Sequence, residues 1–275
     1  MKNYKIVFVD IDNTLNPPNT AISEHTKDVM HELKNKGIKV VACTSHSAKY
    51  SELISKEVGL SDYIISSSGA EIYDANNKKQ IFSKSISKST IRQVYKYAIS
   101  HDLTIVLNSF AKSFISSDKF NYEDNSAIYF DDIEEVLSNY SINQVVLLGT
   151  NYNRMLVLPY LFKDKYSDIN ISDSSNSLIE YNKNKPDYYF HAIVSKNTSK
   201  SKGIIELLDY LDLSSNDAIS IGAGYSDICM CDVCHTSIAM DEGTSALKKV
   251  STFVISSKDD GAAKMLEKLC LNRGE

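Results

Sequence analysis

The chain has 275 residues, of which 43% are hydrophobic and 24% are charged, and its formal net charge is −5. This composition is typical of an ordinary globular protein with one large domain or two smaller ones. The acidic balance argues against a general nucleic-acid-binding protein, which usually has a basic face, but it is compatible with one small anionic ligand bound at a local basic site.

The first part of the chain predicts alternating strands and helices. Residues 4–9 are an apolar run typical of a buried strand, and a helix is expected from the N-cap Ser23 to a stop at Gly37. Residues 38–45 and 63–73 are the next two predicted strands, with a second helix between them. Strands and helices at this spacing indicate a parallel sheet with helical crossovers.

The middle of the chain has a different pattern. An amphipathic helix, with Ile91, Val94 and Ala98 on one face, is followed by strand-like runs and short helices up to about residue 180. Polar stretches near 83–89 and 182–187 are natural linkers. We therefore expect a separate α+β unit in this region.

From residue 200 the alternation of strand and helix returns, with a predicted helix at 201–212 and a predicted strand at 218–222. The chain is therefore predicted to be an α/β protein, a Rossmann-like parallel-sheet core with an inserted α+β unit. The expected boundaries are 1–82 and 188–275 for the core and 83–187 for the insert.

Membrane and secretory features are missing from the sequence pattern. No stretch approaches the ~20 apolar residues of a membrane-spanning helix, and the apolar run after Lys5 is broken by Asp10 too early for a signal peptide. The five cysteines fit reduced thiols. We expect a cytoplasmic protein, a monomer or a homodimer, without nucleic-acid or membrane partners.

Polar residues gather at the carboxyl ends of the predicted parallel strands, where ligands bind in open α/β sheets. They are Asp10 and Asp12 after the first strand, Thr44 and Ser45 after the second, Asp227 after strand 218–222, and Lys202 at the start of the preceding helix. Carboxylate oxygens suit Mg²⁺, and a hydroxyl and an ammonium group can neutralise phosphoryl oxygens. This set can therefore hold Mg²⁺ and a phosphoryl group.

The segment "DIDNTL" resembles the D-x-D-x-T signature of the haloacid dehalogenase superfamily. Later segments resemble those of its Cof-type sugar-phosphatase branch, in order: "SSSGAEIYD", "SKSKGI", "IGAGYSDICM", "TSIAM" and "SSKDDGAAKML". The match runs nearly end to end. It implies a core with an α+β cap inserted after the third strand, and residues 83–187 are the expected cap.

The resemblance also implies a Mg²⁺-dependent phosphatase that hydrolyses small phosphorylated metabolites through an aspartyl-phosphate. Asp10 would be the nucleophile, and Asp12 would protonate the leaving oxygen and then activate water. Mg²⁺ would be bound by Asp10, by the backbone carbonyl of Asp12 and by Asp227. The phosphoryl group would be bound by Thr44, Ser45 and Lys202.

Three departures from the family pattern bear on activity. The usual metal-binding aspartate after "I-G" is Ala223, the asparagine that follows is Ser226, and the usual Gly-Arg after Thr44 is Ser45-His46. An alanine cannot ligate a cation, so one oxygen has to come from water or from a rearranged Asp227. We expect weakened Mg²⁺ affinity and reduced turnover. The alternative is a catalytically weak or inactive protein of the same fold that binds a phosphorylated ligand.

Plainer interpretations exist for the same residues. Asp10 and Asp12 also fit an Asx-turn at a strand end, Thr44 an ordinary strand end, and Lys202 a solvated lysine at a helix start. A glycosyltransferase that holds a nucleotide-sugar with Asp10-x-Asp12 is disfavoured, because that motif usually follows a nucleotide-binding unit. The later segments of the family pattern favour the phosphatase.

The segment "CMCDVCH" contains the C-x-x-C-H pattern of c-type haem attachment. It also offers Cys229, Cys231, Cys234 and His235 as zinc ligands. Cys231 and Cys234 are spaced like two positions on one helical face. We therefore interpret these cysteines as small buried hydrophobic residues.

Overall fold

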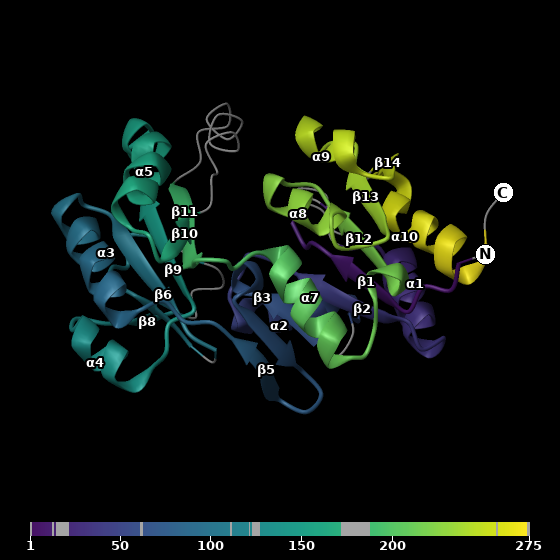
Figure 1. Ribbon diagram of the computed structural model, residues 1–275, viewed down its shortest axis with the longest axis horizontal. Helices are drawn as coiled ribbons and strands as arrows, with labels where there is room; N and C mark the ends of the chain where they lie inside the picture. Colours follow the sequence, from purple (N-terminus) through teal and green to yellow (C-terminus); the bar gives the residue numbers. More distant parts are fainter. Residues whose placement is uncertain are drawn as a thin grey trace. The chain divides into compact units, whose positions relative to one another are not determined.

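The computed structural model describes residues 2–12, 14, 22–60, 63–110, 112–120, 122, 127–171, 188–256 and 258–273 (Figure 1). It divides into two compact units. The core unit consists of Met1–His46, Ser51–Phe82 and Ser199–Glu275, and the inserted unit consists of Ser47–Tyr50 and Ser83–Thr198. Within the described ranges, no helix combines the length and the apolar character that crossing a membrane requires.

The core unit is built on an eight-stranded sheet in the order β14-β13-β12-β1-β2-β3-β4-β5. Neighbouring strands are parallel from β14 to β3, and β4 is antiparallel to β3. The strands are β1 (Ile6–Val9), β2 (Lys39–Cys43), β3 (Tyr63–Ser66), β4 (Glu71–Asp74), β5 (Lys79–Ser83), β12 (Ala218–Gly222), β13 (Thr236–Met240) and β14 (Phe253–Ile255). The predicted α/β class with a parallel-sheet core is confirmed.

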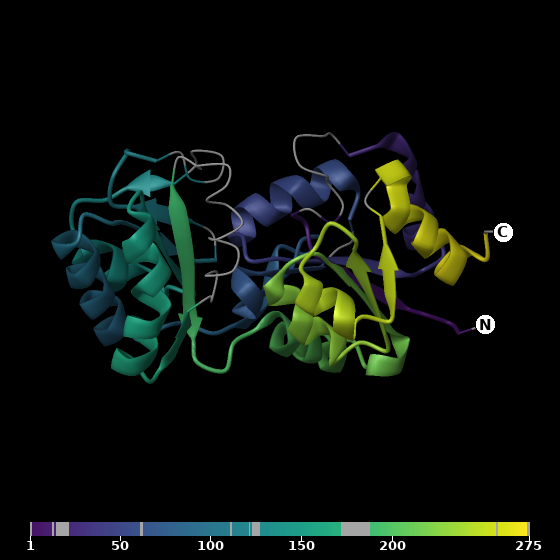
Figure 2. The same cartoon turned by 90° about the horizontal axis from the view of Figure 1, so that it is seen from above.

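Helices cover both faces of this sheet (Figure 2). One face packs on α7 and α8 through a buried cluster that includes Phe8, Ile65 and Leu207, while α1 and α10 contact each other on the opposite face. The helices are α1 (Glu24–Asn35), α2 (Ala48–Val58), α7 (Lys200–Tyr210), α8 (Ile228–Cys231), α9 (Ser245–Val250) and α10 (Gly261–Leu266), the 3₁₀ helices η1 (Ser67–Gly69), η3 (Ser215–Asp217), η4 (Tyr225–Asp227) and η5 (Lys258–Asp260), and a π-helix over Glu267–Leu271.

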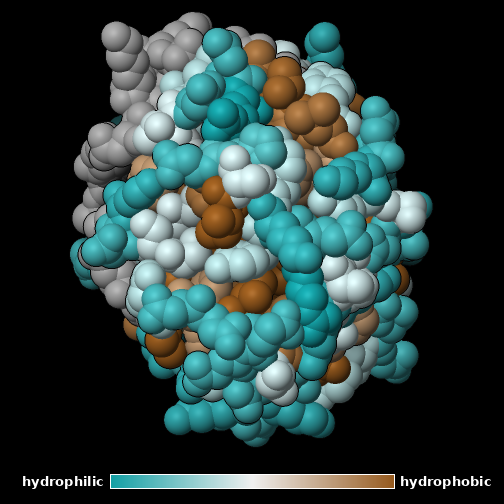
Figure 3. Space-filling view, turned by 90° about the vertical axis from the view of Figure 1, so that its left-hand side faces the viewer, coloured by the Kyte–Doolittle hydropathy of each residue, from teal (hydrophilic) through white to brown (hydrophobic). Residues whose placement is uncertain are grey.

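The inserted unit has its own six-stranded sheet in the order β10-β11-β9-β6-β7-β8. Its strands are β6 (Thr104–Asn108), β7 (Ser113–Ile115), β8 (Ile128–Tyr129), β9 (Gln144–Gly149), β10 (Ile169–Ile171) and β11 (Tyr189–Ser195). The helices α3 (Lys88–Ser100), α4 (Ile133–Asn139) and α5 (Tyr152–Lys165) pack on it through a buried apolar cluster. Figure 3 shows one face of the molecule, which is mostly hydrophilic with separate hydrophobic patches.

The second boundary of the inserted unit lies later than the sequence predicts. The predicted boundary at residue 188 assigns strand β11 (Tyr189–Ser195) to the core, but it pairs with β9 and β10 of the inserted sheet. The core therefore resumes at Ser199 rather than at residue 188. The physical reason is that a buried apolar strand has the same sequence pattern in either sheet, and only its hydrogen-bonded neighbours decide to which sheet it belongs.

The predicted single strand over residues 63–73 is also corrected, because the chain reverses within it. Strand β3 ends at Ser66, and β4 runs back antiparallel to it, with Ser66 opposite Glu71. The reversal is made by η1, in which Ser67, Ser68 and Gly69 have φ values of 51°, 56° and 91°. Three successive left-handed residues are rare for L-amino acids. The small residues of "SSSG" permit the turn. The sequence nevertheless predicts one strand, because apolar strand-like residues lie on both sides of this segment.

Gly69 has no room for a side chain in this turn. A Cβ atom there would lie 2.0 Å from the carbonyl oxygen of Ser199, whereas a Cβ at Gly37, which also has a positive φ of 78°, would meet nothing within 4 Å. We predict that Gly37→Ala lowers the free energy of unfolding by about 1–2 kcal/mol, the cost of the left-handed backbone alone. Gly69→Ala should cost about 1–3 kcal/mol more, because backbone atoms have to move.

Urea unfolding of the two variants and of the natural protein measures this difference. Equal losses in the two variants would show that Gly69 is not in tight contact with the start of α7.

Candidate functional site

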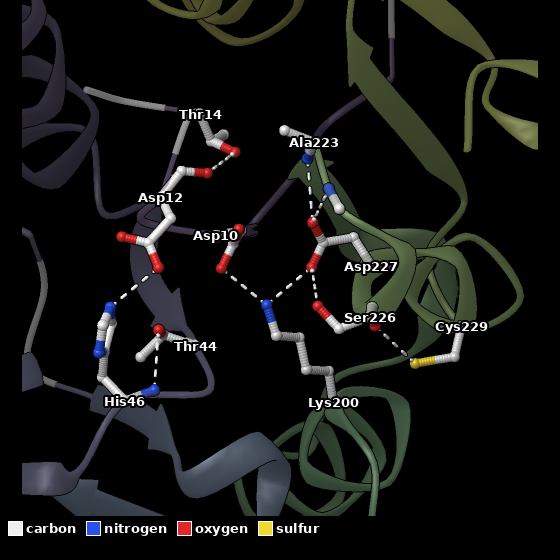
Figure 4. A network of polar contacts seen from close by, with 11 residues as sticks. Asp10, Asp12, Thr14, Thr44, His46, Lys200, Ala223, Ser226, Asp227 and Cys229 are labelled. Atoms are coloured by element: carbon white, nitrogen blue, oxygen red, sulfur yellow. Dashed lines mark hydrogen bonds and ion pairs between the residues drawn. The ribbon is translucent and has the colours of Figure 1, made fainter. Parts of the chain in front are cut away.

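The polar residues expected at the carboxyl ends of the core strands come together in one network (Figure 4). All of its members belong to the core unit. Asp10 and Asp12 follow β1, Thr44 follows β2, Asp227 lies in η4 after β12, and Lys200 begins α7. The parallel order β12-β1-β2 brings these strand ends side by side, which is why residues distant in sequence meet.

The ammonium group of Lys200 lies between two buried carboxylates. Its Nζ atom is 2.7 Å from Oδ1 of Asp10 and 2.7 Å from Oδ1 of Asp227. The side chain of Lys200 is 2% exposed, that of Asp10 is 9% exposed and that of Asp227 is fully buried. Buried charges are tolerated only when they are paired in this way.

The electrostatics of this group follow from its burial. Burial raises the pKa of Asp10 to about 7, and the negative charge of Asp227 adds to this effect, while Lys200 opposes it. Burial alone would lower the pKa of Lys200, but the charges of Asp10 and Asp227 outweigh it and raise that pKa above its usual value. Lys200 therefore carries a positive charge at neutral pH.

Asp227 is held in place by hydrogen bonds to both of its oxygens. Its Oδ2 accepts the backbone N–H groups of Ala223 at 2.9 Å and Gly224 at 2.8 Å. Its Oδ1 accepts from Lys200 and, at 3.4 Å, from the hydroxyl of Ser226. A metal ion would have to displace one of these donors to reach Asp227. The contacts thus favour a role in holding Lys200 and the loop after β12 over the predicted role as a metal ligand.

Asp12 points away from Lys200 and pairs with a residue that sequence reasoning did not single out as a partner. Its Oδ2 is 2.9 Å from Nε2 of His46. Partial burial would raise the pKa of the Asp12 carboxyl, but the hydrogen bond and charge of His46, together with Lys200, lower it overall. The only sequence signal for this pair was the departure at His46 from the usual family residue.

Thr44 and Ser45 lie where the sequence predicts, in the loop after β2. Thr44 is buried, and its Oγ1 accepts the backbone N–H of His46 at 3.2 Å. Its own hydroxyl hydrogen can still be donated to a ligand. Ser45 is half-buried. Thr14, the threonine of the D-x-D-x-T segment, donates its hydroxyl to the carbonyl of Asp12 at 3.3 Å.

The prediction that Lys202 balances the charge of Asp10 is corrected, because Lys200 occupies that place. Lys202 is exposed, and its backbone N–H is bonded to the N-cap Ser199. The helical phase explains the difference. Lys200 lies one turn before Gly203 and Ile204, which are buried against the sheet, whereas residues two apart on a helix face different directions. The buried stripe of this helix was the signal that could have identified Lys200.

The residues present offer few free oxygens to a cation. Among the described residues, no group of three or more His, Cys, Asp or Glu side chains is arranged to hold a metal ion. Asp10 uses Oδ1 to bind Lys200, and its Oδ2 is left for another partner. The backbone carbonyl of Asp12 accepts the hydroxyl of Thr14 at 3.3 Å. Two protein oxygens plus water and a phosphoryl group are a donor set that Mg²⁺ accepts.

The cysteine-rich segment does not form a site in the described part of the chain. The Sγ atom of Cys229 contacts the carbonyl of Ser226, and Cys231 contacts the hydroxyl of Ser251. Cys234 is buried, and this burial raises the pKa of its thiol to about 12. Cys229 and Cys231 are half-buried, so the prediction of a buried cysteine holds for Cys234 and is corrected for Cys231.

Comparison with known proteins identifies relatives of the whole chain. The family model for haloacid dehalogenase-like hydrolases matches residues 7–266. A protein of Buchnera aphidicola (subspecies Baizongia pistaciae) named "Putative phosphatase" is 28% identical, and the match covers 97% of this chain and 98% of that protein.

Solved structures share the fold. A haloacid dehalogenase-like hydrolase from Bacteroides thetaiotaomicron has a TM-score of 0.81 at 18% identity, covering 97% of this chain and all of that one. The subclass IIB sugar phosphatase BT4131 has a TM-score of 0.74 at 19% identity, covering 96% of this chain and 98% of that one.

The contrast between Lys200 and Lys202 can be tested directly. We predict that Lys200→Met lowers the free energy of unfolding at pH 8 by about 3–5 kcal/mol, because it leaves two buried carboxylates without their cation. Lys202→Met removes an exposed charge and should change stability by less than about 0.5 kcal/mol. Urea unfolding at pH 8 measures both; similar effects of the two substitutions would contradict the assignment of Lys200.

Proposed function

The chain belongs to the haloacid dehalogenase-like hydrolase family, and on this basis we propose that it is a Mg²⁺-dependent phosphatase acting on small phosphorylated metabolites such as sugar phosphates. The observation that carries the proposal is the buried Asp10, with one oxygen paired to Lys200 and the other free of hydrogen bonds to described residues. A carboxylate fixed through one oxygen presents the other as a nucleophile in a defined direction.

In the proposed first step, Oδ2 of Asp10 attacks phosphorus and the bond from phosphorus to the leaving oxygen breaks. Asp12 delivers a proton to that oxygen. Because the pKa of Asp12 is lowered, we infer that this proton is held within the pair that Asp12 forms with His46, whose Nε2 lies 2.9 Å from Oδ2 of Asp12. The hydroxyl of Thr44 donates to the phosphoryl oxygens. Lys200 supplies positive charge beside the attacking carboxylate.

In the second step, water attacks phosphorus of the aspartyl-phosphate. Asp12, now a carboxylate, accepts a proton from this water, the bond from phosphorus to Asp10 breaks, and inorganic phosphate leaves. The exposed side chain of Asp12, which is 63% accessible, suits a group that exchanges protons with water and substrate in turn. Asp12 therefore acts as an acid in the first step and as a base in the second.

Asp10, through the carboxylate oxygen that does not attack phosphorus, and the backbone carbonyl of Asp12 are the protein groups that would hold Mg²⁺. When bound, Mg²⁺ supplies charge neutralisation that lets an anionic carboxylate approach an anionic phosphoryl group. Ala223 supplies no oxygen, and both oxygens of Asp227 are already hydrogen-bonded. We therefore infer a weakly bound cation and a slow phosphatase.

A second candidate function is a catalytically inactive protein that binds a phosphorylated ligand. Ala223 favours it, because the missing carboxylate affects the metal more than the phosphoryl group. Thr44 and Lys200 can bind a phosphoryl oxygen through a hydroxyl and an ammonium group without a metal ion. The substitutions below separate the two candidates.

We predict that Asp10→Asn removes hydrolysis of a small phosphomonoester almost completely, by roughly 1,000-fold or more, since an amide is a poor nucleophile. Asp74→Asn is the matched control, because Asp74 is another buried carboxylate of the core sheet, hydrogen-bonded to Asn77 and outside the site. It should keep near-natural turnover. Circular dichroism checks that both variants fold, and unchanged turnover in folded Asp10→Asn would show that the hydrolysis takes place elsewhere.

Restoring an oxygen at position 223 should strengthen the metal site. We predict that Ala223→Asp raises the Mg²⁺ affinity by about 10-fold or more, the scale on which partners of a metal site act, and increases turnover. Ala223→Asn, which adds a neutral oxygen of similar reach, should give a smaller gain. Mg²⁺ titrations by calorimetry and by hydrolysis measure both effects.

Two results of these titrations would change the interpretation. If the natural protein already saturates at low Mg²⁺ and Ala223→Asp has no effect, position 223 is not a vacated ligand site. If Ala223→Asp tightens Mg²⁺ without any gain in hydrolysis, the binding protein becomes the better account.

A further inference from the structure

Glu71 is a buried carboxyl group that the proposed chemistry does not use. It is the first residue of β4, and its side chain has no exposed surface. Its Oε2 accepts the hydroxyls of Ser67 at 3.3 Å and Ser66 at 3.5 Å, and its Oε1 accepts from Nε2 of Gln80 at 3.2 Å. Within the described residues, neutral donors are its hydrogen-bond partners and no Lys, Arg or His forms an ion pair with it. Burying a carboxyl group in this way is costly, so we ask which neighbouring segments this group holds in place.

The turn beside Glu71 holds the loop that carries Thr44 and His46. The backbone N–H of Ser67 donates to the carbonyl of His46 at 2.7 Å, and that of Ser68 donates to the carbonyl of Thr44 at 3.1 Å. The hydroxyl of Ser67 meanwhile binds Glu71. Ser67 thus connects the buried carboxyl group to the loop through a single residue.

The other side of the same turn touches the start of α7. Gly69 is so close to the carbonyl of Ser199 that a Cβ would lie 2.0 Å from it, and a Cβ at Gly203 would lie 3.1 Å from the Cα of Gly69. Ser199 is the N-cap of α7, and Lys200 is its first residue. One left-handed turn therefore contacts both segments that supply the site.

We propose that Glu71 is a positioning residue: through Ser67 it fixes the left-handed turn, and through this turn it sets the placement of the Thr44–His46 loop and of the start of α7. The left-handed backbone of Ser67 and Ser68 is unfavourable for these residues. It persists only where surrounding contacts hold it, and Glu71 supplies one of them by accepting the hydroxyl of Ser67. The proposed catalytic use of this loop rests on the proposed function, whereas the positioning itself does not.

The protonation state of Glu71 matters for this role. Burial raises its pKa to about 7, although the hydrogen bonds from Ser67, Ser66 and Gln80 act in the opposite direction. The groups that face it from β3, η1 and β5 are these neutral donors. A carboxylate accepts from all of them, and hydrogen bonds to an ionised acceptor are roughly twice as strong as neutral ones. The neutral acid has to donate its own proton, so the turn is held most firmly above neutral pH.

Ionisation of Glu71 has the opposite effect on the free energy of unfolding of the whole protein. Because the pKa is higher in the folded protein than its ordinary value of 4.5, the folded state binds the proton more tightly, and this group's contribution to stability falls as the pH rises from that value towards 7. The ionised Glu71 thus orders the turn at a cost to the global stability of the fold.

Glu71→Gln tests the proposal in the full-length chain, because glutamine has the shape of the neutral acid and does not titrate. Amide hydrogen exchange at Ser67 and Ser68, corrected for the intrinsic effect of pH, is the direct measurement. We expect protection in the variant to fall about 10-fold relative to the natural protein at pH 8 and by less than about 2-fold at pH 6. The affinity for inorganic phosphate should fall in the same pH-dependent way.

Asp74→Asn, at the other end of β4, is the control and should leave exchange at Ser67 and Ser68 unchanged. Ser67→Ala, which removes a single hydroxyl, tests the same link if Glu71→Gln fails to fold, and it should reduce protection in the same direction. Equal protection of natural protein and variants at both pH values would overturn the proposal. Because this measurement needs no turnover, absence of phosphatase activity would count against the proposed function and leave the positioning result standing.

Discussion

The ion pairs of Lys200 with Asp10 and Asp227 are the interaction on which the rest of the site depends. Two carboxylates and one ammonium group are buried together, so the cluster has one surplus negative charge when all three are ionised. Burial is the main reason that the pKa of Asp10 rises to about 7 although a lysine lies 2.7 Å away, and the negative charge of Asp227 adds to this effect. A site with uncompensated negative charge attracts a cation, which supports the proposal that Asp10 holds Mg²⁺.

The fold produces this cluster by ending several segments at the same place. Asp10 ends the central strand β1, Asp227 follows its neighbour β12, and Lys200 comes one residue after the chain returns from the inserted unit. Strand β11 of the inserted sheet ends at Ser195, and the N-cap Ser199 follows four residues later, directly before Lys200. The turn over Ser67–Gly69 fills the remaining side, where it contacts both the start of α7 and the loop after β2.

Ala223 and His46 both change the charge around the nucleophile, Ala223 on the side of Asp227 and His46 beside Asp12. Where the family pattern has an aspartate beside Asp227, this chain has Ala223, which carries no carboxylate. The backbone N–H of Ala223 donates to Asp227. His46 adds an imidazole beside Asp12 and lowers the pKa of that carboxyl. Ala223 reduces the negative charge near the reacting group relative to the family pattern, whereas His46 replaces the arginine of that pattern and so reduces the permanent positive charge there. The loss of a carboxylate at position 223 weakens the attraction for a metal ion.

The sequence by itself determined the α/β class, the parallel core, the interrupted chain and the strand ends at which Asp10, Asp12, Thr44 and Asp227 lie, because apolar periodicity and local turn chemistry are properties of short segments. It also contained the helical phase that distinguishes Lys200 from Lys202. Only the tertiary structure decided the sheet to which β11 belongs, the pairing of Asp12 with His46, the reversal at Ser67–Gly69 and the burial of Glu71. These depend on which distant segments become neighbours, and no local pattern records the distance between two side chains that are far apart along the chain.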